Sequence, residues 1–206
     1  MKISYAITAH NEAQELNRLL KQLTEGKQGE DEIMIQLDDT ATDKVKFVVD
    51  SYPVKSITFP LNKDFAAFKN NLKNNCTGDY IFFIDADEYL SEHLLKLVRQ
   101  VLEANDSVEC YGVPRVNTVK GLTEEHIKTW HWRVDEKGRV NWPDYQTRIC
   151  KNVPSIQWVG KVHERLEGWK TSSIFPAEFE DWALYHPKDI QRQELKKVKR
   201  FLPGLI

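Results

Sequence analysis

The sequence is poor in cysteine: its 206 residues contain only Cys76, Cys110 and Cys150, which lie far apart. No two of them form a Cys-x-x-Cys pair, so the spacing argues against a zinc site and against a disulfide framework. Three scattered thiols are typical of a reducing compartment. We therefore expect a protein that resides in such a compartment.

Long apolar runs are also missing. The strongest one, Tyr80–Ile84, is far shorter than the roughly 20 residues that a membrane-spanning helix requires. The N-terminal residues 1–12 turn polar too early for a signal peptide. We therefore expect no transmembrane segment and a cytoplasmic location, with peripheral attachment at the inner membrane face left open.

An excess of charge of either sign is absent, because the net charge is only −2. This balance gives no indication of a nucleic acid partner. The exception is a basic segment near the C-terminus that contains Lys196, Lys197, Lys199 and Arg200. We interpret this segment as the solvated face of a terminal helix, with a specific anionic partner as the alternative.

The first hundred residues alternate between strand patterns and helix patterns. Apolar and β-branched stretches predict strands at residues 2–9, 32–37, 54–59 and 80–84. Leucines at positions 16, 19, 20 and 23 have helical spacing, and Asp64 and Ser91 are suited to cap two further helices. The order β-α-β-α-β-α-β predicts an α/β fold with a mostly parallel sheet and helices on both faces.

The regular alternation ends after about residue 108. Short strand-like pieces, tryptophans and a hairpin signal at residues 135–138 follow, and residues 188–201 are predicted to form a last helix. The sequence contains no repeat and no low-complexity linker. We therefore predict one domain, residues 1–206, with a nucleotide-binding half at 1–107 and a smaller, irregular half at 108–206.

Acidic residues follow three of the predicted strands. The first strand runs into His10–Glu12, the second into Asp38-Asp39 and the fourth into Asp85–Glu88. In folds of this class, ligands bind at the edge of the sheet where the carboxyl ends of the strands meet. We therefore expect these three loops to form one site.

Asp85 and Asp87 flank Ala86 at the end of a buried strand. Strand alternation would point their side chains apart, so they converge only where the strand has ended and turned. Carboxylates in such a position can hold Mg²⁺ or Mn²⁺, which in turn binds a diphosphate through its oxygens. The alternative is a turn or a helix cap, although Ser91 is the better cap. We favour the metal site.

The other two loops are suited to a nucleoside. Asp38 and Asp39 repel each other unless one of them meets a donor, such as a nucleobase imide or a ribose hydroxyl. The alternative is a solvated turn that Thr40 supports. We assign Asn11 and Glu12 to the same pocket.

Lys69 and Asn70 lie on the helix that follows Asp64. From there they can reach a diphosphate above the edge of the sheet. The alternative, equally weighted, is that they are ordinary exposed helix residues.

In this order and spacing, the motifs resemble those of family 2 glycosyltransferases with the GT-A fold. The segments that carry the resemblance are Ile7–Glu12, Leu37–Asp43, Asp64–Asn70 and Gly78–Glu88. The Asp-Ala-Asp-Glu form of the last segment is similar to a subgroup that includes bacterial lipopolysaccharide-core glucosyltransferases. That subgroup also tends to carry an arginine followed by a Trp-x-Gly-x-Val-His-Glu stretch, which here are Arg148 and residues 158–164.

The resemblance implies a metal-dependent transfer of a sugar from a nucleotide-diphosphate donor, with a UDP-sugar favoured, to a carbohydrate or lipid-linked glycan acceptor. It implies inversion at the anomeric carbon, with Glu164 as the base that takes the acceptor's proton. His186 is expected to join Asp85 and Asp87 as a third ligand of Mn²⁺ or Mg²⁺. The donor contacts are expected from Ala9, Asn11, Glu12, Asp38, Asp39, Lys69, Asn70, Asp85, Ala86 and Arg148.

The sequence departs from the family in its acidic loop. The usual Asp-Asp-Gly-Ser is Asp38–Ala41 here and has no glycine, which leaves the choice of nucleobase open. The alternative for Glu164 is a surface pair with His163, and the alternative for His186 is a structural histidine. Arg148 is suited to a phosphate or to a carboxylate.

Aromatic rings line many sugar sites, and the second half of the chain holds all six tryptophans. Most are expected in the core, and Trp142 or Trp158 is expected on the acceptor side. Two other functions compete for the whole chain. One is a non-catalytic nucleotide-sugar-binding or scaffold module of the same fold. The other is a sugar-nucleotide pyrophosphorylase, which ranks low because no glycine-rich loop follows the first strand.

Overall fold

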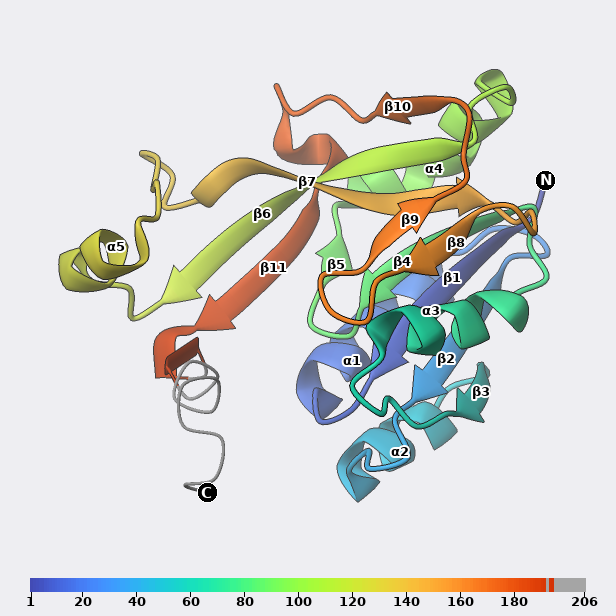
Figure 1. Ribbon diagram of the computed structural model, residues 1–206, viewed down its shortest axis with the longest axis horizontal. Coiled ribbons are helices and arrows are strands. Elements are labelled where there is room, and N and C mark those ends of the chain that lie inside the picture. Colours follow the sequence, from blue (N-terminus) through green and yellow to red (C-terminus); the bar gives the residue numbers. More distant parts are fainter. Residues whose placement is uncertain (192, 195–206) are drawn as a thin grey trace.

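The computed structural model describes residues 1–191, 193 and 194 of the chain (Figure 1). Its first half alternates strands and helices in the predicted order. The elements of this half are β1 (Ile3–Ala9), α1 (Ala13–Gly26), β2 (Glu32–Leu37), α2 (Asp43–Asp50), β3 (Lys55–Thr58), α3 (Phe65–Asn74), β4 (Tyr80–Asp85), β5 (Tyr89–Leu90) and α4 (Glu92–Ala104).

The second half consists mostly of strands. Two long strands, β6 and β7, form its centre, and shorter strands pack around them. The elements are β6 (Cys110–Lys120), α5 (Glu124–Trp130), β7 (Val140–Lys151), β8 (Gln157–Val159), β9 (Arg165–Glu167), β10 (Ser172–Ile174), the 3₁₀ helix η1 (Glu180–Trp182) and β11 (Leu184–Asp189).

One sheet runs through both halves of the described chain. Its nine strands follow the order β3-β2-β1-β4-β7-β6-β11-β5, with β10 beside β6, while β8 and β9 pair separately. Strands β3, β2, β1 and β4 are parallel, whereas β7 is antiparallel to β4 and β6. The predicted fold class is confirmed: a mostly parallel α/β sheet flanked by helices, with a smaller and less regular C-terminal half.

The central strands are apolar along their length because both faces of the sheet are covered. On β4, Tyr80, Phe82 and Ile84 belong to one hydrophobic cluster, and Ile81 and Phe83 belong to another. Helices α1, α2 and α4 contribute to the first cluster, and α3 with strands β8 and β9 contributes to the second. This two-sided burial is the physical reason for the continuous apolar run in the sequence.

Both predicted helix caps are present. The Asp64 carboxylate accepts a hydrogen bond from the backbone N–H of Ala67 at 2.9 Å, and the Ser91 hydroxyl accepts one from Leu94 at 3.0 Å. The predicted turn at residues 135–138 is also present, closed by a 2.9 Å backbone hydrogen bond between its ends.

The prediction of a last helix from residue 188 is wrong at its start. Strand β11 continues to Asp189, because its residues pair in parallel with Arg115–Lys120 of β6. Residues 190, 191, 193 and 194 are helical. The remainder of the predicted helix, with the basic residues at 196–200, lies outside the described residues.

None of the helices that the structure describes is long and apolar enough to cross a membrane. The three cysteines are buried and free. Burial raises the pKa of the Cys76 thiol to about 12 and that of Cys110 to about 11, so both are neutral core residues at neutral pH.

The strand register brings the polar loops of the first half to one edge of the sheet. Thr8 of β1 lies opposite Asp85 of β4, and Ala9 lies opposite Leu37 of β2. The chain therefore leaves three neighbouring strands at the same level, just where the acidic loops begin.

Strands β8 and β9 pack against the sheet on the side of α3. The Trp158 ring packs edge-on against Phe83 of the sheet, with the ring centroids 5.2 Å apart. The Asn70 side chain donates to the Trp158 carbonyl at 2.8 Å and accepts from its N–H at 2.9 Å. Helix α3 and strand β8 are thus joined side by side, and the loop after β8 is held above the sheet.

We expect Gly168→Ala, at the end of β9, to destabilise the protein more than Gly138→Ala. Both glycines have a positive φ, +90° and +74°, so either alanine carries backbone strain of roughly 1 kcal/mol. At Gly168 the new Cβ would also lie 1.8 Å from the carbonyl oxygen of Ser155, whereas nothing lies within 4 Å of it at Gly138. We expect this overlap to cost Gly168→Ala about 1–3 kcal/mol of stability beyond the loss in Gly138→Ala. Urea denaturation of both variants measures the two free energies of unfolding. Equal losses in the two variants would contradict the packing of this segment.

Candidate active site

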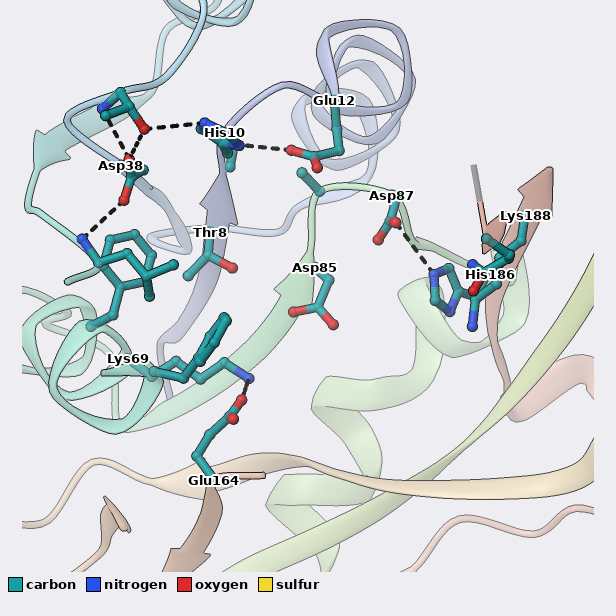
Figure 2. Close-up of a pocket in the computed structure, with 17 residues that line it drawn as sticks. Thr8, His10, Glu12, Asp38, Lys69, Asp85, Asp87, Glu164, His186 and Lys188 are labelled. Atoms are coloured by element: carbon teal, nitrogen blue, oxygen red, sulfur yellow. Dashed lines mark hydrogen bonds and ion pairs between the residues drawn. The ribbon is translucent and has the colours of Figure 1, made fainter. Parts of the chain in front are cut away.

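A cavity of about 570 Å³ opens at the carboxyl edge of β1, β2 and β4 (Figure 2). It lies where the sequence predicted a site, and most of the predicted residues line it. These are Ala9, Glu12, Asp38, Lys69, Asp85, Ala86, Asp87, Glu164 and His186. The segments that form the cavity are far apart in the sequence, since residues 8–12, 85–87 and 186–188 all contribute to it.

Four predicted donor contacts are not among the residues that line this cavity: Asn11, Asp39, Asn70 and Arg148. Asn11 and Asp39 are exposed at their loop tips. The amide of Asn70 is bound to the backbone of Trp158, and Arg148 is buried and lines a neighbouring cavity instead. Direct contact of these residues with a donor therefore stays a prediction.

The carboxylate of Asp38 holds the surrounding loops together. It accepts hydrogen bonds from the backbone N–H of Thr40 at 2.9 Å and of Leu61 at 2.9 Å. Burial would raise the pKa of Asp38, but the hydrogen bonds from Thr40 and Leu61 lower it below its usual value. The structure thus contains the turn that the sequence left open as the alternative for this residue.

The carboxylate of Glu12 has a comparable place in the first loop. It accepts hydrogen bonds from the backbone N–H groups of His10 at 3.0 Å and Asn11 at 2.9 Å. The first loop is therefore folded back on itself, with Glu12 at the cavity and Asn11 turned to the surface.

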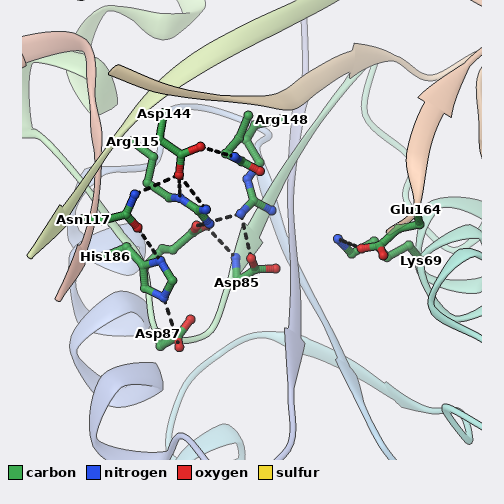
Figure 3. Close-up of polar contacts among 11 residues, drawn as sticks. Lys69, Asp85, Asp87, Arg115, Asn117, Asp144, Arg148, Glu164 and His186 are labelled. Carbon is green, nitrogen blue, oxygen red and sulfur yellow. Dashed lines mark hydrogen bonds and ion pairs between the residues drawn. The ribbon is translucent and has the colours of Figure 1, made fainter. Parts of the chain in front are cut away.

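An ion-pair network that is largely buried lies at the end of β4 (Figure 3). The guanidinium of Arg148 contacts Asp85 and Glu88, each at 2.6 Å, and Arg115 contacts Glu88 at 3.0 Å and Asp144 at 2.7 Å. The Glu88 side chain has no exposed surface, and it also accepts the backbone N–H of Asp85 at 3.0 Å. This network fixes the end of β4.

The same network keeps Asp85 ionised. Burial would raise the pKa of this carboxyl, but the charges of Arg148 and then Lys69 hold it well below its usual range. Asp85 is therefore a carboxylate at any pH near neutrality, which is the form that binds a hard cation.

His186 reaches the cavity from β11. Its Nε2 lies 3.3 Å from a carboxylate oxygen of Asp87, and its Nδ1 lies 3.0 Å from Oδ1 of Asn117. The amide nitrogen of Asn117 donates to Asp144 at 2.8 Å, so Oδ1 is the acceptor and Nδ1 of His186 carries the hydrogen. Nε2 is therefore the ring atom that faces Asp87.

The arrangement is compatible with a divalent cation shared with a phosphate. No group of three or more histidine, cysteine or acidic side chains is gathered for a metal ion in the described ranges. Asp87 and His186 are in contact, however, and Asp85 lines the same cavity. Mg²⁺ commonly takes one or two protein carboxylates and completes its shell with water and phosphate oxygens, so this donor set fits such an ion.

Lys69 and Glu164 form an ion pair at the opposite wall, 2.6 Å between Nζ and the carboxylate (Figure 2). The Lys69 ammonium also lies 4.4 Å from the centre of the Trp158 ring. A second cavity of about 280 Å³ begins behind this pair, and Lys69, Asp85 and Glu164 line both cavities. Trp158 lines the second cavity, whereas Trp142 packs against Arg139.

Sequence reasoning missed four supporting residues: Glu88, Arg115, Asn117 and Asp144. Arg115 and Asn117 lie two residues apart on β6, and both donate hydrogen bonds to the same carboxylate oxygen of Asp144. Glu88 follows Asp87 directly, and an acidic residue so close to a buried strand was the one sequence feature that could have indicated its role in the site. The partners of these residues come from distant strands, which no local pattern could reveal.

The sequence matches the family model described as glycosyl transferase family 2 over residues 4–164. No curated protein matches it significantly in sequence. The fold is similar to the crystal structure of S. aureus TarS 1–349, with 15% identity, a TM-score of 0.59 and coverage of 98% of this chain. The chain spans 64% of the length of that structure.

Two further structures are similar in fold. The complex of S. aureus TarS 1–349 with UDP-GlcNAc has a TM-score of 0.59 at 15% identity, covering 91% of this chain and 59% of that one. Glucosyl-3-phosphoglycerate synthase from Mycobacterium tuberculosis, in complex with Mg²⁺ and UDP, has a TM-score of 0.50 at 12% identity, covering 73% and 56%. At these identities the likeness establishes the fold.

We expect Glu88→Gln to destabilise the protein strongly, by about 3–5 kcal/mol, because it leaves two buried guanidinium groups without a full counter-charge. The matched control is Glu167→Gln on β9, whose pair with Arg165 is exposed and contributes less than about 1 kcal/mol. Urea denaturation of both variants measures the difference. A Glu88→Gln variant as stable as Glu167→Gln would show that the buried network does not hold the end of β4.

Proposed function

The chain belongs to glycosyl transferase family 2, and on that premise we propose that it transfers a sugar from a nucleoside-diphosphate donor to a hydroxyl acceptor. The observation that carries this proposal is the cavity at the carboxyl edge of β1, β2 and β4. The Asp87–His186 pair stands on one of its walls and the Lys69–Glu164 pair on the other. The likeness in fold to a protein bound to UDP-GlcNAc supports a UDP-sugar as the donor.

The charge of the cavity supports metal dependence. Carboxylates outnumber lysines among the described residues that line it: Glu12, Asp38, Asp85, Asp87 and Glu164 against Lys69 and Lys188. A diphosphate would be repelled from such a surface unless a cation lay between them. We therefore propose that Asp85, Asp87 and His186 hold Mn²⁺ or Mg²⁺. Such an ion, when bound, neutralises the charge that grows on the leaving diphosphate.

The two walls of the cavity are proposed to have different tasks in the reaction: one stabilises the leaving diphosphate and the other activates the acceptor. At the anomeric carbon, the bond to the diphosphate oxygen breaks and its electron pair leaves with the diphosphate. The acceptor oxygen forms the new bond from the opposite side, which inverts the configuration. We propose that Glu164 receives the proton of the acceptor hydroxyl on its carboxylate.

Arg148 and Glu88 support the finer assignment to the subgroup with the Asp-Ala-Asp-Glu motif. Both belong to the sequence features that resemble the lipopolysaccharide-core glucosyltransferases, and their side chains are 2.6 Å apart. We propose that Arg148 acts on the donor site through its ion pair with Asp85. A carbohydrate or lipid-linked glycan is the proposed acceptor class.

We also propose the single-domain division made from the sequence, with residues 1–107 as the nucleotide-binding half and 108–206 as the acceptor half. The ion pair between Arg148 and Asp85 crosses the two halves, as does the contact between His186 and Asp87. A site assembled across both halves favours an enzyme over the non-catalytic scaffold, which stays the alternative function.

We predict that the protein binds one nucleoside diphosphate in a Mn²⁺-dependent manner and that Asp87→Ala abolishes this binding without unfolding the protein. A ligand that binds only the native state raises the melting temperature by mass action. A thermal-shift screen of UDP, GDP, CDP and dTDP, each with and without Mn²⁺, identifies the base, and calorimetry then gives the affinity. Asp43→Ala, at an exposed carboxylate on α2, is the control and should bind as the wild type does. Unchanged affinity in Asp87→Ala would exclude the metal role of this residue.

We predict that Glu164→Gln keeps nucleotide binding but loses donor turnover by roughly 10²-fold or more, because the glutamine amide cannot accept the proton. Release of UDP from a panel of UDP-sugars, with water as the acceptor, measures this turnover. A variant with near-normal turnover would rule out Glu164 as the base, and a wild type that binds nucleotide without turnover would favour the scaffold function.

A further inference from the structure

The Lys69–Glu164 ion pair is well defined and mostly shielded from solvent. The two charged groups are 2.6 Å apart, and their side chains are only 12% and 16% exposed. The ammonium of Lys69 also makes a cation–π contact with the Trp158 ring, 4.4 Å from the ring centre. Lys69 comes next after Arg148 among the charges that lower the pKa of Asp85, so its ammonium acts on the carboxylate at the end of β4.

In the part of the chain that the structure describes, Lys69 and Lys188 are the two lysines that line the cavity at the edge of the sheet. An entering diphosphate brings more negative charge than the single carboxylate of Glu164, and its oxygens accept hydrogen bonds from an ammonium equally well. The lysine side chain has a flexible four-carbon stem and three donors, so it can turn from one partner to another. Figure 3 shows the pair to one side of the Arg148 network with no contact drawn between them, so such a movement would break none of the ion pairs of Arg148.

We infer that Lys69 is shared between Glu164 and the diphosphate of the donor, so that donor binding releases the Glu164 carboxylate. This inference rests on the proposed function and adds an order of events to it. Before the donor binds, Lys69 occupies lone pairs of the carboxylate that has to receive the acceptor's proton. After it binds, Lys69 stabilises the diphosphate and those lone pairs are available.

The second cavity provides the place where the released carboxylate acts. It measures about 280 Å³, and Glu164 lines it together with Trp158, Tyr145 and Gln146 and with the charged residues Lys69, Asp85, Arg115, Arg148 and Arg165. Rings and amides of this kind are suited to a hydroxyl-bearing group such as a sugar ring. The acceptor thus enters behind the ion pair and meets an available base only when the donor is in place.

The inference is tested by a double-mutant cycle on nucleotide binding, with UDP and saturating Mn²⁺ as the probe. The four proteins are the wild type, Glu164→Gln, Lys69→Met and the double variant, with affinities from calorimetry. We expect Glu164→Gln to bind UDP about tenfold more tightly, because Lys69 no longer has to leave a charged partner. Lys69→Met should bind more weakly than the wild type. In the Lys69→Met background, Glu164→Gln should change the affinity by less than about twofold.

The Lys69→Met background distinguishes a lysine shared between Glu164 and the diphosphate from simple repulsion between Glu164 and the nucleotide. If Glu164 only repelled the nucleotide through space, its replacement would tighten binding equally with or without Lys69. Glu167→Gln removes an exposed carboxylate nearby on β9 and should leave the affinity unchanged. The glutamine in Glu164→Gln and the methionine in Lys69→Met are close in shape to the residues that they replace. The melting temperature of each variant verifies that it is folded.

The possible outcomes have distinct meanings. Tighter binding of Glu164→Gln that disappears in the Lys69→Met background supports the inference. Unchanged or weaker binding of Glu164→Gln, or equal tightening in both backgrounds, overturns it and leaves the proposed function standing. A wild type that binds none of UDP, GDP, CDP and dTDP would overturn the proposed function and this inference with it.

Discussion

The site depends on one buried interaction, the contact of Arg148 with Asp85 and Glu88 at the end of β4. Ionised carboxylates are not buried without compensation, and Glu88 has no exposed surface at all. Two arginines from β6 and β7 provide that compensation, and these strands continue the sheet beside β4, with β7 antiparallel to it. The position of Asp85, and with it the floor of the cavity, follows from this requirement.

The two walls of the cavity are held in different ways, and this difference suits their proposed tasks. On one side His186 is oriented through Asn117 and Asp144, a relay of neutral and charged hydrogen bonds that leaves little freedom to the ring. On the other side a flexible lysine holds Glu164 through a single ion pair. A metal site benefits from rigid ligands, whereas a base that waits for its substrate benefits from a partner that can leave.

The local sequence pattern predicted helices and strands well where burial of side chains required that pattern. The run from Tyr80 is apolar on both faces because clusters of side chains cover both faces of β4, and the caps at Asp64 and Ser91 satisfy backbone donors of their own helices. The same reasoning failed at residues 188 and 189, where helical spacing was overridden by pairing of β11 with β6. It was also insufficient for Asn70, whose amide binds the backbone of Trp158, a residue 88 positions away.

The sequence by itself determined the alternation of strands and helices, the mostly parallel sheet and the edge at which Glu12, Asp38, Asp85 and Asp87 gather. Each of these follows from periodicity and from the geometry of parallel strands, which are local properties. Only the tertiary structure decided the partners: Arg148 with Asp85, His186 with Asp87, and Lys69 with Glu164. Such contacts form between side chains that the fold brings within a few ångströms, and the separation of the residues along the chain carries no information about that distance.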